Sequence, residues 1–373
     1  MIDATPQQTA EWIRDPVVLR GYRANAGPRI GLDTEFIRER TYWPVLALVQ
    51  IATSEHILLV DPRVPGIPEA LRDWLDDDSI LKIMHSAGED LIALRQACGS
   101  LPSPLFDTQT AAALAGKGAG LGYQALVRDI TGVELAKGET RTDWLQRPLT
   151  PAQHEYAADD VRHLFALHDA LDARLQELGR DDWLRQDCAL AVELAREHRP
   201  ERWPHLGVRA AQVLERPAQT RLLRLLRWRD QRAVERDLPR NWVIAPELAI
   251  ELARIDPVDR TTIANVLART PQAPQSLAAV IAEALDAPVA DEAEMPLVID
   301  DRDRDRRQLQ SLQAAVAKRS AELGLPDGVL ASRRILQAWQ DNGDWPETVS
   351  AWRRRELDAL LDERHTPTEA ADA

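Results

Sequence analysis

Short apolar runs alternate with longer helical segments between about residues 28 and 170 of the chain. The runs that read as strands are RIGLDTEF (29–36), VLALVQIAT (45–53), HILLVDP (56–62) and ILKIMHS (80–86). The first three follow one another closely, which predicts a meander at the start of a sheet. The fourth leads into the helical segment GEDLIALRQACG, and residues 149–178 keep a helical period throughout. This alternation is typical of an α/β fold.

A change of pattern at HRPERWP, residues 198–204, precedes a second half that is almost entirely helical. A charged stretch, DAPVADEAEMPLVIDDRDRDRR, divides that half again. The predicted organisation is an α/β domain at 1–200, a helical bundle at 205–290, a linker at 291–307, a second helical bundle at 308–365 and a disordered tail at 366–373. A length of 373 residues agrees with two or three domains.

Composition sets limits on the class of protein. No run of about 18 apolar residues occurs, so we expect no membrane span. The polar, acidic N-terminus is unlike a signal peptide, and Cys98 and Cys188 lie far apart without a C-x-x-C, which argues against a zinc or disulfide framework. These features predict a cytoplasmic protein. The net charge of -14 argues against a nucleic-acid partner, but the local distribution of charge matters more than the total.

Two acids, Asp33 and Glu35, stand two residues apart in the first strand-like run. Because side chains at i and i+2 of a strand point to the same face, their carboxylates project together. Such a pair alone could simply face solvent. A functional site built on Asp33 and Glu35 would therefore require further acids from elsewhere in the chain. Asp90 lies in the first turn of the helix that follows the fourth strand. Alternatively, Asp90 or Glu89 could have no role beyond stabilising the start of this helix through its interaction with the helix dipole.

A further acid, Asp160, lies in a helix with clear start signals. Thr150 as N-cap, Pro151 at the first helical position and a Gln at N3 predict that this helix begins here. Tyr156 and Asp160 are then i and i+4 on one helical face. The structural alternatives are a half-buried packing tyrosine and a surface acid.

Gathered acids suit divalent cations, because Mg²⁺ prefers carboxylate, water and phosphate oxygens. Cleavage of a phosphodiester by a pair of ions needs them about 3.5–4 Å apart, bridged by shared carboxylates. Without cations the clustered carboxylates repel one another, and at least one pKa should rise. A metal-dependent hydrolase is therefore the function that these residue types would serve.

Three segments resemble, in the right order, the exonuclease motifs of the DEDD superfamily: LDTEF, HSAGEDL and YAADDV. The longer run GVELAKGETRTDWLQRPLTPAQHEYAADDVRHL resembles the ribonuclease D family, and the similarity covers roughly residues 28–195. The resemblance implies a ribonuclease H-like exonuclease domain with a mixed sheet. It implies that Asp33, Glu35, Asp90 and Asp160 are catalytic metal ligands and that Tyr156 orients the attacking water.

The implied activity is 3′ to 5′ exoribonuclease action by two divalent cations, Mg²⁺ or Mn²⁺, with release of 5′-mononucleotides. The implied substrates are tRNA precursors and other small structured RNAs. A phenol with a pKa near 10 is a poor base at neutral pH, so we expect Tyr156 to act by hydrogen bonding. A DNA-directed exonuclease would use the same acids. A non-catalytic RNA-binding protein on this fold would lack some of them, and all four are present.

The superfamily also has a branch with a third-motif histidine spaced H-x-x-x-x-D, which His154 and Asp159 would fit. Five residues of helix place these two side chains about 140° apart, on different faces. Tyr156 and Asp160 differ by only about 40°. The helical geometry therefore favours the tyrosine branch.

Weaker candidates lie near the motifs. His85 precedes Asp90 and could meet a phosphate, although a structural histidine is at least as good an explanation. GKGAGLG lacks the spacing of a phosphate-binding P-loop and reads as a loop near substrate. Phe36 follows the acid pair and so faces away from it, which favours a core position over base stacking.

The helical half contains an arginine-rich run, RLLRLLRWRDQRAVERDLPRNW, in which leucines supply an apolar face. A salt-bridged surface helix would explain this pattern. The surrounding sequence also resembles the HRDC module, which implies auxiliary binding of RNA through backbone phosphates. The candidate contacts are Arg224, Arg227, Arg229 and Arg232. Residues 308–363 look like a second, divergent copy, and no heptad seam is evident, so we expect a monomer.

Overall fold

The computed structural model describes residues 9–136, 138, 142–256, 258–271, 273, 275–299 and 306–365. The predicted disordered tail and residues 300–305 of the predicted linker lie outside these residues. The chain forms two compact units, one made of residues 1–37, 44–197 and 310–373 and the other of residues 38–43 and 198–309. No described helix is long and apolar enough to cross a membrane.

A six-stranded sheet forms the centre of the first unit, in the order β1-β4-β3-β2-β5-β6. Its strands are β1 (Ala10–Ile13), β2 (Arg29–Ile37), β3 (Val45–Ala52), β4 (Ile57–Val60), β5 (Leu81–Met84) and β6 (Leu105–Asp107). β2, β3 and β4 pair antiparallel, as the predicted meander requires. β1, β5 and β6 add parallel pairs, so the sheet is mixed, which confirms the expected α/β fold. The sequence did not predict β1 and β6, which have four and three residues.

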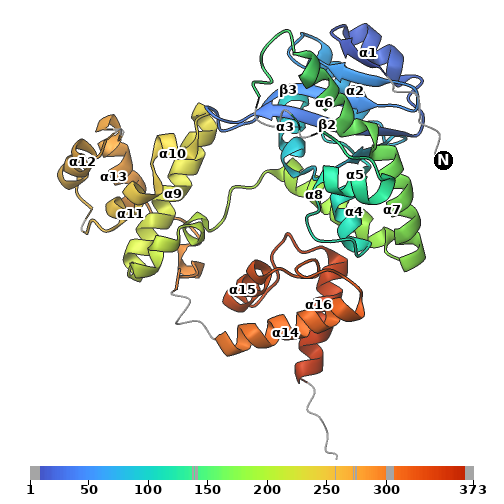
Figure 1. Ribbon diagram of the computed structural model, residues 1–373. Helices are drawn as coiled ribbons and strands as arrows, with labels where there is room; N and C mark the ends of the chain where they lie inside the picture. The colour runs from blue at the N-terminus through green and yellow to red at the C-terminus, as the bar shows by residue number, and fades with distance from the viewer. Residues whose placement is uncertain are drawn as a thin grey trace, which may run out of the picture. The chain divides into compact units, whose positions relative to one another are not determined.

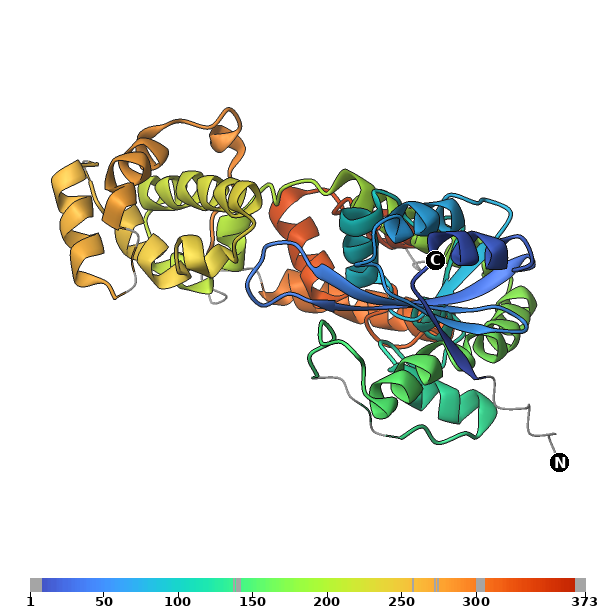
Figure 2. The same ribbon diagram turned by 90° about the horizontal axis from the view of Figure 1, so that it is seen from above.

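Helices cover both faces of this sheet (Figure 2). They are α1 (Pro16–Arg23), α2 (Ile67–Leu75), α3 (Gly88–Cys98), α4 (Thr108–Leu114), α5 (Tyr123–Thr131), α6 (Pro151–Arg162), α7 (Leu164–Leu178) and α8 (Asp181–Glu197). Both α3 and α6 pack against β2 and β3 (Figure 1). The core between them is apolar and closed, with Leu32, Val49 and Leu94 at 0–1% exposure. This packing fixes the two helices relative to the strand that carries the acid pair.

The C-terminal helices α14 (Arg306–Glu322), α15 (Arg333–Asn342) and α16 (Ala351–His365) belong largely to the first unit. Trp352 stacks on Trp183 of α8 with ring centroids 4.2 Å apart, and its indole N–H donates to Asp187 at 2.9 Å. The neighbouring Arg353 also pairs with Asp187. Residues of this predicted second bundle are therefore docked on α8, while its relation to the HRDC module stays a prediction.

The second unit is a bundle of short helices around α9. Its helices are η1 (Pro204–Gly207), η2 (Arg209–Val213), α9 (Arg216–Arg236), α10 (Arg240–Val243), α11 (Pro246–Ala253), α12 (Arg260–Arg269), η3 (Gln275–Leu277), α13 (Ala278–Asp286) and η4 (Glu292–Glu294). The leucines predicted to be apolar on α9 form its core, with Leu222, Leu225 and Leu226 at 0% exposure. The loop between β2 and β3 joins this unit, where the Tyr42 N–H donates to Asp237 at 3.0 Å.

Candidate active site

β2 presents Asp33 and Glu35 from the middle of the sheet, where β2 pairs with β3 on one side and β5 on the other. Their alternation with buried Thr34 confirms that the two acids share one face of the strand. Directly after Glu35 the register with β3 shifts by one residue, which leaves Ala47 unmatched. A bulge at this point bends the strand beside the acids.

Asp90 is brought to the acid pair by the start of α3. Asp107 holds this start in place, because its carboxylate accepts from the Ala87 N–H at 2.8 Å while it also caps α4. Asp90 is only 8% exposed, and the Thr34 hydroxyl donates to it at 2.5 Å. Thr34, which lies between Asp33 and Glu35 on β2, therefore orients Asp90 of α3.

Asp160 reaches the same place from α6, which packs on β2, β3 and β4. The predicted start of this helix is confirmed: Thr150 and Gln153 form a complete capping box, with Pro151 in the first turn. Tyr156, one turn earlier, donates its hydroxyl to Asp160. The two side chains thus share a face of α6, as their spacing predicted.

The four carboxylates form one partly buried, electrostatically coupled cluster. Burial is the main cause that raises the pKa of Glu35 to about 8 and the pKa values of Asp90 and Asp160 to about 7. The pKa of Asp33 rises well above its usual range through burial and through the charges of the other three acids. No lysine or arginine side chain is among the main causes of these raised pKa values. Acids that are far apart in sequence therefore repel one another here, as expected of a site for positive ligands.

The donor set fits divalent cations, because hard ions bind carboxylate oxygens and their charge would offset this repulsion. Among the described residues, no three acidic, histidine or cysteine side chains already converge closely enough to share one ion. Metal binding would therefore require the carboxylates to move closer together. The cluster suits hydrolysis of a phosphodiester, in which negative charge develops on two oxygens.

Comparison with known proteins agrees with this chemistry. Residues 16–176 match a family model described as 3′-5′ exonuclease. Ribonuclease D of Xanthomonas oryzae pv. oryzae is 52% identical over 94% of this chain and 97% of its own length. Ribonuclease D of Pseudomonas paraeruginosa is 36% identical over 94% and 96%. The chain belongs to the ribonuclease D family.

The structural comparison extends this family relationship over almost the whole chain. The crystal structure of Escherichia coli RNase D, an exoribonuclease involved in structured RNA processing, superposes with a TM-score of 0.80. The two sequences are 30% identical, and the match covers 95% of this chain and 99% of the other. The ribonuclease D-like protein is therefore a 3′–5′ exoribonuclease with a ribonuclease H-like domain, as the motifs predicted. Its family and its buried acids point to dependence on divalent metal.

His85, a candidate for contact with RNA, lies inside the ribonuclease D fold. Its Nδ1 is 2.8 Å from the Thr108 hydroxyl, and its ring meets Tyr123 edge-on at 5.6 Å. Burial lowers the pKa of His85, which keeps the ring neutral. The structure thus gives His85 a role in packing beside the acids, and its contact with RNA stays a prediction.

Sequence reasoning missed Tyr123, which follows the glycine-rich loop. Its hydroxyl donates to the Asp159 carbonyl at 2.8 Å and accepts the His163 N–H at 3.3 Å. It therefore fixes the end of α6, one residue from Asp160. Burial raises the pKa of Tyr123, with a contribution from Asp33 and Asp160. No spacing rule could have revealed this contact, because it joins segments 36 residues apart.

Gly138 is a second residue that the motifs did not single out. A Cβ at this position would lie 1.8 Å from Cδ2 of Tyr156, so only glycine allows the backbone this close to the ring. Trp144 contacts the same ring, with centroids 5.9 Å apart. The segment before α6 therefore packs on the tyrosine that contacts Asp160.

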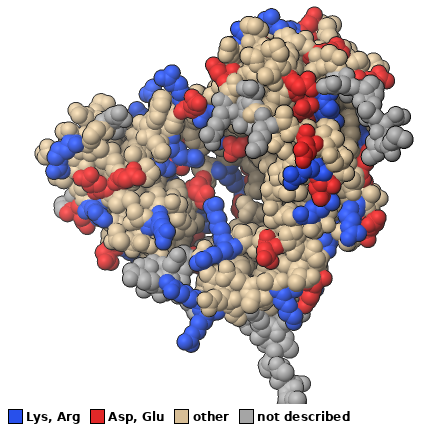
Figure 3. Space-filling model, viewed as in Figure 1, with Lys and Arg blue, Asp and Glu red and all other residues tan. Residues whose placement is uncertain are grey.

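The arginines of α9 are mostly engaged within the second unit. The ion pairs are Arg224 with Glu292 at 2.7 Å, Arg227 with Asp291 at 2.6 Å and Arg229 with Asp230 at 2.7 Å. Arg232 instead lies over the ring of Trp228, 5.7 Å from its centroid. On the face seen in Figure 3, basic and acidic side chains are interspersed. Contact of the first three with RNA would require these pairs to open.

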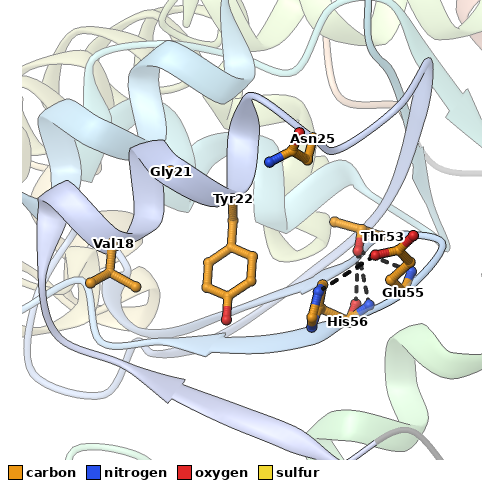
Figure 4. Close-up of a pocket in the computed structure, with 7 residues that line it drawn as sticks. All are labelled: Val18, Gly21, Tyr22, Asn25, Thr53, Glu55 and His56. Atoms are coloured by element: carbon orange, nitrogen blue, oxygen red, sulfur yellow. Dashed lines mark hydrogen bonds and ion pairs between the residues drawn. The ribbon is translucent and has the colours of Figure 1, made fainter.

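A cavity of about 340 Å³ lies beside α1 and the turn between β3 and β4 (Figure 4). The Tyr22 hydroxyl donates to Glu11 at 2.6 Å, and His56 Nδ1 lies 3.0 Å from the same carboxylate. These contacts tie α1 and the turn to β1. No motif residue lines the cavity, so its polar groups serve the local structure of this ribonuclease D-like domain.

Proposed function

We propose that this enzyme trims the 3′ ends of tRNA precursors and other small structured RNAs, one nucleotide at a time, and releases 5′-mononucleotides. The observation that carries the proposal is the partly buried cluster of four acids from three separate segments. Burial raises the pKa values of all four, and the charges of other members of the cluster raise those of Asp33, Glu35 and Asp160 further. The E. coli relative acts in structured RNA processing, which supports this class of substrate.

Asp33, Glu35, Asp90 and Asp160 would hold two divalent cations, Mg²⁺ or Mn²⁺. When bound, these ions supply Lewis acidity to the attacking water and charge stabilisation to the leaving 3′ oxygen. Thr34 holds the Asp90 carboxylate in place through its hydroxyl. The proposal further includes a monomeric protein in the cytoplasm.

Tyr156 would position the attacking water. Burial and the nearby acids raise the pKa of Tyr156 well above its ordinary value, so the phenol keeps its proton at neutral pH. It can therefore donate to Asp160 and orient water, but it cannot act as a general base. Gly138 and Trp144 limit the positions that its ring can adopt.

Incubation of the full chain with a 5′-labelled, 3′-extended tRNA precursor and Mg²⁺ should give a ladder that shortens stepwise from the 3′ end. The released products should be nucleoside 5′-monophosphates. Chelator should stop the reaction, and excess Mg²⁺ or Mn²⁺ should restore it, because the acids cannot act without cations. DNA of the same sequence serves as the comparison substrate. Internal cleavage, or activity that survives chelator, would contradict the proposal.

The Tyr156→Phe variant should lower kcat by about 10–100-fold, the usual effect of losing a group that orients the reacting centre. Phenylalanine keeps the ring contacts with Gly138 and Trp144, so the fold should be unchanged. The shape of the pH–rate profile should also stay the same, since the phenol is not titrated in the reaction. Loss of an ionisation from that profile in the variant would show that Tyr156 acts as a base after all.

A further inference from the structure

A second hollow, of about 350 Å³, lies in the helical unit beside α9 and α10. Its lining residues are Arg232, Arg236, Leu238, Trp242, Val243 and Leu277. α10 packs on α9, and the two lie side by side in Figure 1. The hollow therefore combines one exposed aromatic ring, two guanidinium groups and an apolar wall. We call it the α9–α10 groove.

The two arginines of the groove differ from the others on α9. Arg232 and Arg236 are i and i+4, so they stand one above the other on the helix. Within the described part of the chain, neither has an acidic partner. Glu235, the acid between them in sequence, accepts instead from Gln231 at 2.8 Å. Positive charge thus remains uncompensated at the groove, while earlier turns of α9 neutralise theirs.

The aromatic member of the groove is Trp242, which is 56% exposed. An indole ring exposed to this extent offers a flat apolar face on which a planar group can stack. The wall behind it is firm, because Val243 is 4% exposed and belongs to the core of the unit. Leu238 and Leu277 are partly buried against the same core. The ring is therefore presented on a rigid support.

We propose that the α9–α10 groove binds an unpaired nucleotide of the RNA substrate. The base stacks on Trp242, and the neighbouring phosphates meet Arg232 and Arg236. Stacking on an exposed aromatic ring beside arginines is how proteins bind single strands without reading their sequence. The inference rests on the proposed function, since that function supplies RNA as the ligand.

The size and charge of the groove favour RNA over a protein partner. A cavity of this volume falls at the lower end of the range for small-ligand sites, about 300–1,000 Å³. A stable protein interface needs about 800 Å² on each partner, far more than one such hollow supplies. Two uncompensated cations also match phosphates better than an apolar protein surface.

The test measures binding of a 12-nucleotide single-stranded RNA to the full chain by fluorescence anisotropy, with chelator present. Chelator prevents hydrolysis, so the result does not depend on the nuclease assignment, which the tRNA-precursor assay tests separately. Trp242→Ala should weaken binding by about 5-fold to about 100-fold, the effect of losing one stacked base. Trp242→Phe should restore most of it. Val213→Ala, which truncates another exposed apolar side chain of this unit at 66% exposure, is the matched control and should bind as the wild type does.

Salt dependence separates the roles of the two residue types. Arg232→Gln and Arg236→Gln should each lower the slope of log K against log salt by about 1, whereas Trp242→Ala should leave it unchanged. A blunt RNA duplex, which offers no unpaired base, should bind the wild type and Trp242→Ala equally. The proposal fails if Trp242→Ala binds single strands normally or loses duplex binding to the same extent. It also fails if the variant only abolishes self-association of the chain, as measured by sedimentation.

Discussion

The Asp160→Asn variant is expected to lose exonuclease activity by about 10³-fold or more, the scale of losing a group that stabilises transition-state charge. It should nevertheless unfold at a higher temperature than the wild type in metal-free buffer at pH 8. Burial raises the pKa of Asp160 to about 7, so at pH 8 its partly buried carboxylate is mostly charged and is repelled by Asp159 and Asp90. Asparagine keeps the shape and still accepts from Tyr156, but it removes the charge.

Asp159→Asn is the matched control for this variant. Asp159 is the adjacent acid of α6, and its carboxylate pairs with Arg162 at 2.8 Å. Its link to Tyr123 uses the backbone carbonyl, which the substitution keeps. We expect wild-type activity for this variant in the tRNA-precursor assay. If Asp159→Asn were inactive and Asp160→Asn active, the tyrosine assignment of the third motif would be wrong and the His154–Asp159 alternative would be right.

Stability of the metal-free wild type is expected to fall as pH rises from about 5 to about 8. A carboxyl whose folded pKa is raised binds its proton more tightly in the folded state than in the unfolded state. Between the ordinary values near 4 and the raised values of about 7 for Asp90 and Asp160 and about 8 for Glu35, the folded state therefore holds more protons. Each pKa unit corresponds to about 1.4 kcal/mol, so coupled acids together contribute on the order of a few kcal/mol.

Mg²⁺ should reverse this loss at pH 8 and have little effect at pH 5, where protons already neutralise the acids. The measurement is Tm against pH, with chelator and with Mg²⁺, and a change on the order of 5 °C or more is expected for a unit of this size. Asp160→Asn should show a shallower dependence, because one of the titrating groups is gone. A Tm that stays level across this window, and that Mg²⁺ does not raise at pH 8, would contradict the coupled cluster.

The local pattern of apolar and polar residues was sufficient to predict the strand and the helix start that carry Asp33, Glu35 and Asp160. The alternation around Asp33 and Glu35 predicted a strand with both acids on one face, and the signals at Thr150 predicted the start of α6. It failed for β1 and β6, which are too short to show a period and form because neighbouring strands offer them hydrogen bonds. It also treated residues 149–178 as one helical stretch, whereas α6 ends at Arg162.

The arginines of α9 also show what the local sequence pattern cannot predict. Their spacing on an amphipathic helix made Arg224, Arg227, Arg229 and Arg232 equal candidates for contact with RNA. The first two have partners 64–68 residues away in sequence, and these pairs exist only in the folded unit. Charge pattern along a helix does not reveal which cations the fold will neutralise. The groove at Trp242 could be identified only after those pairs were known.

The sequence alone determined which chemistry this protein carries, because acids at i and i+2 of a strand, an acid at a helix start and a Tyr–Asp pair at i and i+4 are local spacings. Only the tertiary structure decided that these acids meet in one partly buried cluster, that Thr34 orients Asp90 and Tyr123 fixes the end of α6, and that residues near the C-terminus dock on α8. Each of these depends on contacts between segments tens of residues apart. Such contacts arise from packing of the whole core, which no local pattern contains.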